Sequence, residues 1–278
     1  MNFWDSVSYM RGHIREVAMP PFHMIGNLYF VGAVNASVHV LDTGDGLILI
    51  DSGYQDTLFY TLNGMYQLGF SPYDIKYVLL THGHIDHFGA ARALREMTGC
   101  KIILGRADLD YVTGARDLSF AAELGMPLEE VAFFEPDILI DDGDVITLGN
   151  TSIECVHTPG HTEGTMSFFF SVEHRGKTLT VGTHGGTGVN SLEAAFLKRH
   201  GLPLSLRDDF RAGLHALKNR HVDVFVGNHA GQSHTKAKYL RLMDGDENAF
   251  VDPTEWAKYL ESCEKNLDDM IAAEAAQM

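Results

Sequence analysis

The stretch "THGHIDHFGA", residues 81–90, places three histidines and one aspartate within six consecutive positions. It follows an apolar run, "IKYVLL", which is typical of a strand buried inside a sheet. A helical pattern, "ARALREMTG", comes next and ends in glycine. A short loop between a strand and a helix therefore carries His82, His84, Asp86 and His87.

The spacing of these four side chains suggests two neighbouring metal sites. Residues two apart in extended backbone point the same way, so His82 and His84 can face one point. We expect the helix to begin near His87 or Phe88, which places Asp86 and His87 at the turn into it, facing a second point. Such a loop suits two metal ions about 3.5–4 Å apart. The alternative, three solvated histidines, explains this spacing at a strand end less well.

Further candidate ligands follow later strands. "VHTPGHTEG" comes after the apolar run "SIECV" and offers His157 and His161, while "GNHAG" comes after "VDVFV" and offers His229. His161 lies in a Pro-Gly turn, the kind of loop that presents a ligand. We interpret His157 as an ordinary strand-end residue, and His234 as a surface residue of the next helix.

The rest of the chain is a succession of short strands and helices. Strands are expected near 28–31, 36–41 and 46–50, with the Asp45-Gly46 pair as a hairpin turn. In the second half, "DILIDDGDVITLG", "TSIECVHT", "TMSFFFSV", "KTLTVG" and "VDVFVG" are expected as strands and "LRDDFRAGLHALKN" as a helix. This order predicts an α/β fold in which two β-sheets pack together with helices on the outer faces.

No Pro- or Ser-rich linker divides the sequence. We therefore expect a single domain over residues 1–278, with an N-terminal extension at about 1–24 and a C-terminal helix at about 253–274. The least regular part is a partly helical insertion at residues 106–135.

Composition narrows the classes of partner. The formal charge of −16 repels phosphate backbones, which argues against nucleic acid. No window approaches the roughly 20 apolar residues of a membrane span. Three distant cysteines, Cys100, Cys155 and Cys263, predict neither a disulfide framework nor a cysteine-based zinc site. We expect a small-molecule substrate and a cytoplasmic location, or a periplasmic or secreted one if an export leader precedes this sequence. The sequence does not indicate an oligomeric state.

Four stretches together resemble the metallo-β-lactamase superfamily: "ILIDSG" with Asp51, "THGHIDH", "HTPGHTEG" and the late "GNHAG". The match covers nearly the whole chain. It implies an αβ/βα sandwich with two zinc ions at the sheet edges, and Asp51 accepting hydrogen bonds that fix the ligand loop. By this resemblance the first zinc is held by His82, His84 and His161, and the second by Asp86, His87 and His229.

One position separates the branches of this superfamily. Most of its hydrolases place a metal-bridging aspartate after the strand that corresponds to "KTLTVG", where this chain has Thr183 or His184. No zinc-binding cysteine is found either. The chain is therefore most similar to the third subclass of zinc β-lactamases, whose second zinc takes Asp, His and His. That subclass often has serines that grip the substrate carboxylate, where this chain has "HGGTG". His184 is either a ligand or substrate contact or an ordinary loop histidine.

The resemblance implies a dinuclear zinc hydrolase, with iron or manganese as alternative metals. Zinc lowers the pKa of bound water from about 15.7 to about 7, and the resulting hydroxide attacks an amide or ester carbonyl. Asp86 is the expected catalytic residue, orienting the hydroxide or passing on its proton. A β-lactam is the favoured substrate. A lactone or thioester is the alternative, and a diiron redox protein is less favoured.

Substrate specificity is expected to lie in the loops over the metals. Three segments are candidates: the N-terminal segment with Phe3 and Trp4, the insertion with Tyr111 and Phe120, and residues 184–206. Aromatic side chains in such loops more often serve packing, so none of them is assigned a role in the site.

Overall fold

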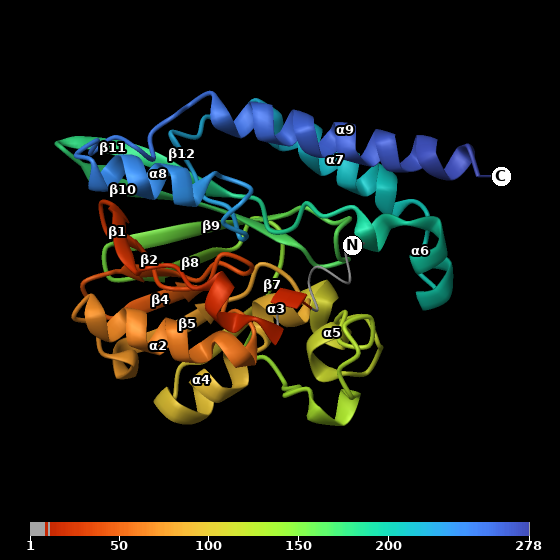
Figure 1. Ribbon diagram of the computed structural model, residues 1–278, viewed down its shortest axis with the longest axis horizontal. Helices are drawn as coiled ribbons and strands as arrows, with labels where there is room; N and C mark the ends of the chain where they lie inside the picture. The colour runs from red at the N-terminus through yellow and green to blue at the C-terminus, as the bar shows by residue number, and fades with distance from the viewer. Residues whose placement is uncertain (1–8, 11, 278) are drawn as a thin grey trace.

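The computed structural model describes residues 9–10 and 12–277, and Figure 1 shows two β-sheets packed face to face with helices on both outer sides. This arrangement confirms the expected αβ/βα sandwich. Phe3 and Trp4, expected near the site, lie outside the described residues.

The first sheet has seven strands in the order of the chain. Its first four strands pair antiparallel, and β4 to β7 pair parallel. The strands are β1 (Phe22–Ile25), β2 (Leu28–Phe30), β3 (His39–Asp42), β4 (Leu47–Ile50), β5 (Ile75–Leu79), β6 (Lys101–Gly105) and β7 (Ile138–Ile140).

The second sheet has five strands in the order β12-β11-β10-β9-β8. All pairs are antiparallel except the parallel β11 and β12. The strands are β8 (Val145–Leu148), β9 (Thr151–His157), β10 (Met166–His174), β11 (Lys177–Thr183) and β12 (Val224–Phe225).

Strand β4 illustrates why the chain forms layers. All four of its residues are buried, because successive side chains point to opposite faces and both faces are covered. Leu47 and Leu49 join the apolar core beneath the helices, whereas Ile48 and Ile50 join the core between the two sheets.

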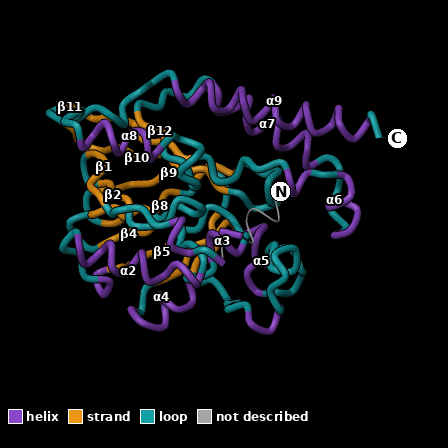
Figure 2. The backbone as a smooth tube through the Cα atoms, viewed as in Figure 1, coloured by secondary structure: helices purple, strands orange, loops and turns teal. Residues whose placement is uncertain are grey.

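Helices cover the outer face of each sheet (Figure 2). In Figure 1, α2 and α4 lie on the outer side of the first sheet, while α7 and α9 run side by side over the second. The indole nitrogen of Trp256 in α9 donates to the Leu217 carbonyl oxygen of α7 at 2.9 Å. The helices are α2 (Leu58–Gln67), α3 (Ile85–Phe88), α4 (Ala91–Thr98), α5 (Leu109–Thr113), α6 (Ala194–His200), α7 (Leu206–Lys218), α8 (Thr235–Met243) and α9 (Glu255–Ala275).

The helix after the histidine-rich loop differs from the expectation. It begins at Ile85, two or three residues early, because the amides of His87 and Phe88 both donate to the His84 carbonyl oxygen. It then breaks after Phe88, where the loop of residues 52–55 packs against it. A side chain at Gly89 would lie 2.9 Å from the Gln55 nitrogen. The second part, α4, ends at the left-handed Gly99 as expected.

Other expected elements are shorter or divided. The strand expected at 36–41 is β3, which begins only at His39, and β12 has two residues. The stretch expected as "DILIDDGDVITLG" splits into β7 and β8, so residues 141–144 carry the chain from one sheet to the other. Strand β1 overlaps the end of the expected N-terminal extension. Within the described ranges, no helix has both the length and the apolar character needed to cross a membrane.

Candidate metal centre

The histidine-rich loop follows β5, and three of its side chains, His82, His84 and Asp86, line a cavity. His82, His84 and His87 are almost completely buried. His84 has extended backbone and caps α3, which places Asp86 and His87 in the first turn of that helix. Residues 82–87 thus lie between the end of β5 and the first turn of α3 and carry four polar side chains.

One group of buried nitrogens joins His82, His84 and His161. One ligand atom from each lies within 4.8 Å of the other two. His161 comes from the turn after β9, and its Nε2 lies 3.0 Å from His84 Nδ1. His82 Nε2 is buried without a hydrogen-bond partner in the described structure. The three-histidine group therefore takes two members from the loop after β5, in the first sheet, and one from the loop after β9, in the second.

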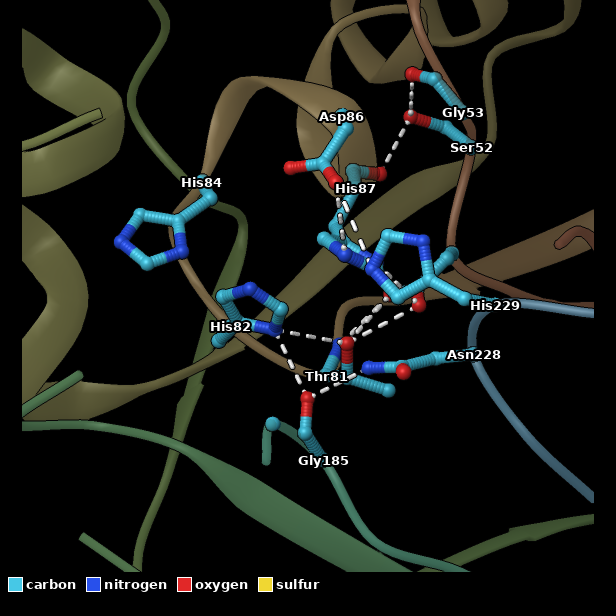
Figure 3. A network of polar contacts seen from close by, with 12 residues as sticks. Ser52, Gly53, Thr81, His82, His84, Asp86, His87, Gly185, Asn228 and His229 are labelled. Carbon is cyan, nitrogen blue, oxygen red and sulfur yellow. Dashed lines mark hydrogen bonds and ion pairs between the residues drawn. The ribbon is translucent and has the colours of Figure 1, made fainter. Parts of the chain in front are cut away.

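A second group surrounds Asp86, and Figure 3 shows Asp86, His87 and His229 beside His82 and His84 of the first. One ligand atom each from His82, Asp86 and His87 also lies within 4.8 Å of the others. Asp86 Oδ2 lies 3.3 Å from His87 Nε2 and 3.5 Å from His229 Nε2. His229 follows β12, so all six side chains that the resemblance assigned to metal converge. Their role as ligands remains a prediction.

The other ring nitrogen of four of these histidines is fixed by an oxygen that only accepts. Nδ1 must therefore carry a proton, which in the neutral ring leaves Nε2 with its lone pair free for a metal. The acceptors are the Gly185 carbonyl for His82 at 2.7 Å, the Gly188 carbonyl for His161 at 2.7 Å, the Asn35 carbonyl for His229 at 2.6 Å and Asp51 Oδ2 for His87 at 2.8 Å.

Asp51 fixes the histidine-rich loop through hydrogen bonds to Thr81 and His87. Its Oδ1 accepts the backbone N–H of Thr81 at 2.8 Å, and its Oδ2 accepts Nδ1–H of His87. The hydroxyl of Thr81 donates to the same carboxylate. Asp51 has a positive φ of 61°, an uncommon conformation for a residue with a side chain. Such strain concentrates at functional sites.

Burial and neighbouring charges set the protonation of the cluster. Burial is the main cause that lowers the pKa of His82 and of His84 well below the usual value, and it lowers that of His161 to about 4. Burial opposes ionisation of Asp86, yet the nearby His87, His229 and His84 together outweigh it and lower the pKa of the carboxyl. Neutral imidazoles beside an ionised carboxylate are the forms that bind a divalent cation.

His87 differs from the other rings. Burial disfavours its charged form, but the carboxylates of Asp86 and Asp51 prevail and raise its pKa to about 10. The ring lies between two negative charges, which favour a proton on each of its nitrogens. A proton on Nε2 therefore occupies the position that a metal would take.

Thr183 and His184 lie apart from the six. Thr183 ends β11 and is buried opposite Phe168. The amide of Gly186 donates to His184 Nδ1 at 3.3 Å, and the His184 ring lies 6.4 Å from that of Phe210 in α7. Neither is among the described residues that line the cavity over the cluster. Their proposed contact with metal or substrate stays a prediction.

His157 and His234 are also outside the cluster. His157 Nε2 lies 2.8 Å from the Glu163 carbonyl oxygen, an ordinary hydrogen bond at a strand end. His234 is exposed and directly precedes α8. These placements agree with the interpretation of both from sequence.

Asp108 is a residue of the site that the sequence did not single out. Its buried carboxylate accepts the Gly83 amide at 2.7 Å, the Thr162 hydroxyl at 2.7 Å and the Gly164 amide at 2.6 Å. Gly83 lies between His82 and His84, while the other two donors follow His161. Asp108 therefore joins the two loops that supply the three-histidine group. An aspartate soon after the buried strand "KIILG" was the available signal.

A cavity of about 570 Å³ opens above both groups. His82, His84, Asp86, His161 and His229 form its floor. The site is thus reachable by a small molecule although His82, His84 and His161 are buried.

Comparison with known proteins agrees with this architecture. Residues 31–191 match the Metallo-beta-lactamase superfamily. BJP-1, a subclass B3 metallo-beta-lactamase of Bradyrhizobium japonicum, aligns over 95% of this chain and 98% of its own with 28% identity and a TM-score of 0.84. Native FEZ-1 metallo-beta-lactamase from Legionella gormanii aligns over 92% and 97% with 27% identity and a TM-score of 0.83.

Curated relatives match over shorter stretches. The hydroxyacylglutathione hydrolase GloC of Haemophilus influenzae is 34% identical over 119 residues, which are 41% of this chain and 53% of that protein. The chain spans between 33% and 57% of the length of the first curated relatives it matches. From the matched region, the fold and the histidine cluster, the chain belongs to the metallo-beta-lactamase superfamily.

Proposed function

We propose that this chain is a metal-dependent hydrolase that opens a cyclic amide of the β-lactam kind and uses two zinc ions. The observation that carries the proposal is the convergence of six side chains with nitrogen or oxygen donor atoms, five of which line one cavity. The likeness to BJP-1 over 95% of the chain favours a ring amide as the substrate.

The donor set fits zinc. Imidazole nitrogen and carboxylate oxygen are common zinc ligands, and four of the five rings have their other nitrogen fixed by an acceptor. The buried Nε2 of His82 lacks a hydrogen-bond partner, a costly arrangement that a bound cation removes. His82, His84 and His161 would hold one ion, and Asp86, His87 and His229 the other. When bound, the ions polarise a carbonyl and make water acidic.

The chain's own residues supply positioning and proton transfer. Asp86 is ionised and lies at the floor of the cavity, so its carboxylate can accept a proton from the attacking water. The water oxygen then bonds to the carbonyl carbon, the carbon–nitrogen bond breaks, and the same proton passes to the departing nitrogen. Asp51 and the Gly185 and Gly188 carbonyls keep the rings in place meanwhile.

Variants of the two groups test this proposal. Zinc-loaded wild-type protein is expected to open a chromogenic cephalosporin, and Asp86→Ala and His161→Ala are expected to lose most of that activity while remaining folded. A homoserine lactone and a glutathione thioester complete the panel. Turnover of only these last two would overturn the ring-amide proposal.

A thioester is the second candidate because of one observation. GloC, named as a hydroxyacylglutathione hydrolase, is 34% identical to this chain over 119 residues. The same six side chains could act on a thioester carbonyl. Comparing turnover of the cephalosporin with turnover of the glutathione thioester distinguishes the two candidate substrates.

A further inference from the structure

The carbonyl oxygen of Gly185 is shared by two buried side chains. His82 Nδ1 lies 2.7 Å from it, and the side-chain amide of Asn228 donates to it, also at 2.7 Å. Figure 3 shows both side chains directed at this one oxygen. Because a carbonyl oxygen only accepts, Asn228 must present Nδ2 to it and His82 must present a protonated Nδ1. Asn228 therefore holds the group that orients a predicted metal ligand.

Gly185 depends on such a contact because it lies in a glycine-rich stretch, "GGTG", residues 185–188, shortly after β11. A Cβ at Gly185 would collide with the Met166 carbonyl oxygen, so a larger residue does not fit there. Glycine leaves the backbone unusually free, and the direction of its carbonyl is therefore not fixed locally. Two side chains from elsewhere fix it: Ser167 Oγ accepts the Gly185 amide at 3.3 Å, and Asn228 donates to the carbonyl.

The backbone of Asn228 is itself fixed by the β2–β3 connection. Its carbonyl oxygen accepts the Ser37 amide at 2.8 Å. The next residue is His229, whose Nδ1 donates to the Asn35 carbonyl oxygen at 2.6 Å. The side chain of Asn228, which is 2% exposed, therefore extends from a fixed backbone to the Gly185 carbonyl.

The other half of this amide argues against a role in stability alone. Asn228 Oδ1 is buried and has no hydrogen-bond partner among the described residues, an arrangement that costs free energy. Asn228 also borders a narrow gap between the sheets, whose apolar walls are Leu28, Ile50, Phe170 and Val226. An apolar side chain would suit this position and would still leave the Gly185 carbonyl bonded to His82. What an asparagine adds is the bond from Nδ2.

We infer that Asn228 is a positioning residue of the predicted metal centre. Its amide fixes the Gly185 carbonyl, and the carbonyl fixes the His82 ring with Nε2 directed at the three-histidine group. The inference rests on the metal-binding part of the proposed function, and its readout is zinc affinity. Failure to open a ring amide would remove the proposed substrate alone, whereas wild-type protein that binds no zinc would overturn both.

Asn228→Leu removes the bond and keeps a side chain of similar size. We expect zinc affinity, measured by competition with a chromophoric chelator, to fall about tenfold, while the denaturant midpoint of the metal-free protein does not fall. Asn27→Leu is the matched control. It also removes a carboxamide bond to a carbonyl, that of Asp42 at 2.8 Å, but Asn27 lies in the β1–β2 turn, outside the described lining of the cavity. Wild-type zinc affinity in Asn228→Leu would overturn the inference.

Two backgrounds separate action through His82 from a disturbance of the neighbouring His229. In His229→Ala one ion is expected to remain in the three-histidine group, and adding Asn228→Leu is expected to weaken its binding about tenfold. In His161→Ala the remaining ion is expected beside Asp86, and adding Asn228→Leu is expected to change its affinity less than about twofold. Equal losses in the two backgrounds, or a loss only in His161→Ala, would overturn the inference. Asn228→Ala, which removes the same N–H group, repeats the comparison if the leucine variants do not fold.

Discussion

The carboxylate of Asp108 accepts the backbone N–H of Gly83 at 2.7 Å, between the two histidines that begin the metal cluster. The same carboxylate accepts two donors from the His161 loop, at 2.7 and 2.6 Å. A single buried side chain thus sets the separation of two loops from different sheets. Because bound metal needs all three rings at fixed distances, this bridge is expected to matter for metal affinity.

Asp108→Asn tests this bridge. The substituted amide turns an N–H group toward backbone donors, so the two loops lose at least one hydrogen bond and shift apart. We expect zinc affinity to fall about 10- to 100-fold. Competition with a chromophoric chelator measures the affinity, and Asp110→Asn, two residues along in α5, is the matched control. Unchanged zinc affinity in Asp108→Asn would remove the proposed bridging role.

Gly186→Ala tests the packing around His161. A Cβ at Gly186 would lie 2.4 Å from His161 Cδ2, so the ring must turn away from the cluster. We expect a loss of zinc affinity of about 10- to 100-fold in a protein that still folds. Gly231→Ala is the control, since Gly231 also lines the cavity but a Cβ there meets nothing within 4 Å. Equal zinc affinity in the two variants would contradict the prediction, because it would show that the backbone around Gly186 moves and the His161 ring keeps its position.

His39 predicts part of the pH dependence of folding. Burial between the sheets lowers its pKa from 6.5 to about 3, so the folded state keeps the ring neutral. Stability from this group is present above pH 6.5 and is lost as the pH falls from there toward 3, by up to about 1.4 kcal/mol per pH unit. Denaturant unfolding of metal-free protein between about pH 5 and 7.5 measures it.

The variant His39→Leu is expected to show a shallower fall in the free energy of unfolding than the wild type over the same pH range. His221→Gln, at an exposed position, is the control and is expected to keep the wild-type slope. Parallel curves for wild type and His39→Leu would contradict the prediction. Metal-free protein is used so that the histidine cluster makes the same contribution to the pH dependence of unfolding in the wild type and in both variants.

Removal of metal is expected to destabilise the fold. The cluster binds cations only when its loops are assembled, so a cation at about 100 times its dissociation constant stabilises the folded state by about 2.7 kcal/mol. For a chain of this size such a loss lowers Tm by roughly 5–11 °C. Calorimetry before and after chelation measures the change, and added zinc should restore Tm. A Tm that chelation leaves unchanged would argue against a cluster that binds metal.

The histidine-rich loop could be interpreted from sequence because its chemistry lies in side chains at short, fixed spacing. His82, His84, Asp86 and His87 follow one strand, and the strand itself is marked by an apolar run. His161 and His229 were found in the same way, each in a turn after an apolar segment. The layered fold followed from the order of these segments.

Other parts of the site have no such signature. The acceptors for His82 and His161 are backbone carbonyls of Gly185 and Gly188, and any residue type supplies a carbonyl. Asp108 lies in the irregular insertion, where no periodicity indicates which side chain turns inward. The break in the helix at Gly89 depends on the distant loop of residues 52–55, a tertiary contact that local pattern does not contain.

Metal content of the purified, zinc-loaded and desalted protein tests the central claim most directly. Two zinc ions per wild-type chain are predicted, falling to about one in His161→Ala and in His229→Ala, because each variant removes a ligand from a different group. A folded wild-type protein that retains no divalent cation would contradict the claim that these six side chains form a metal centre.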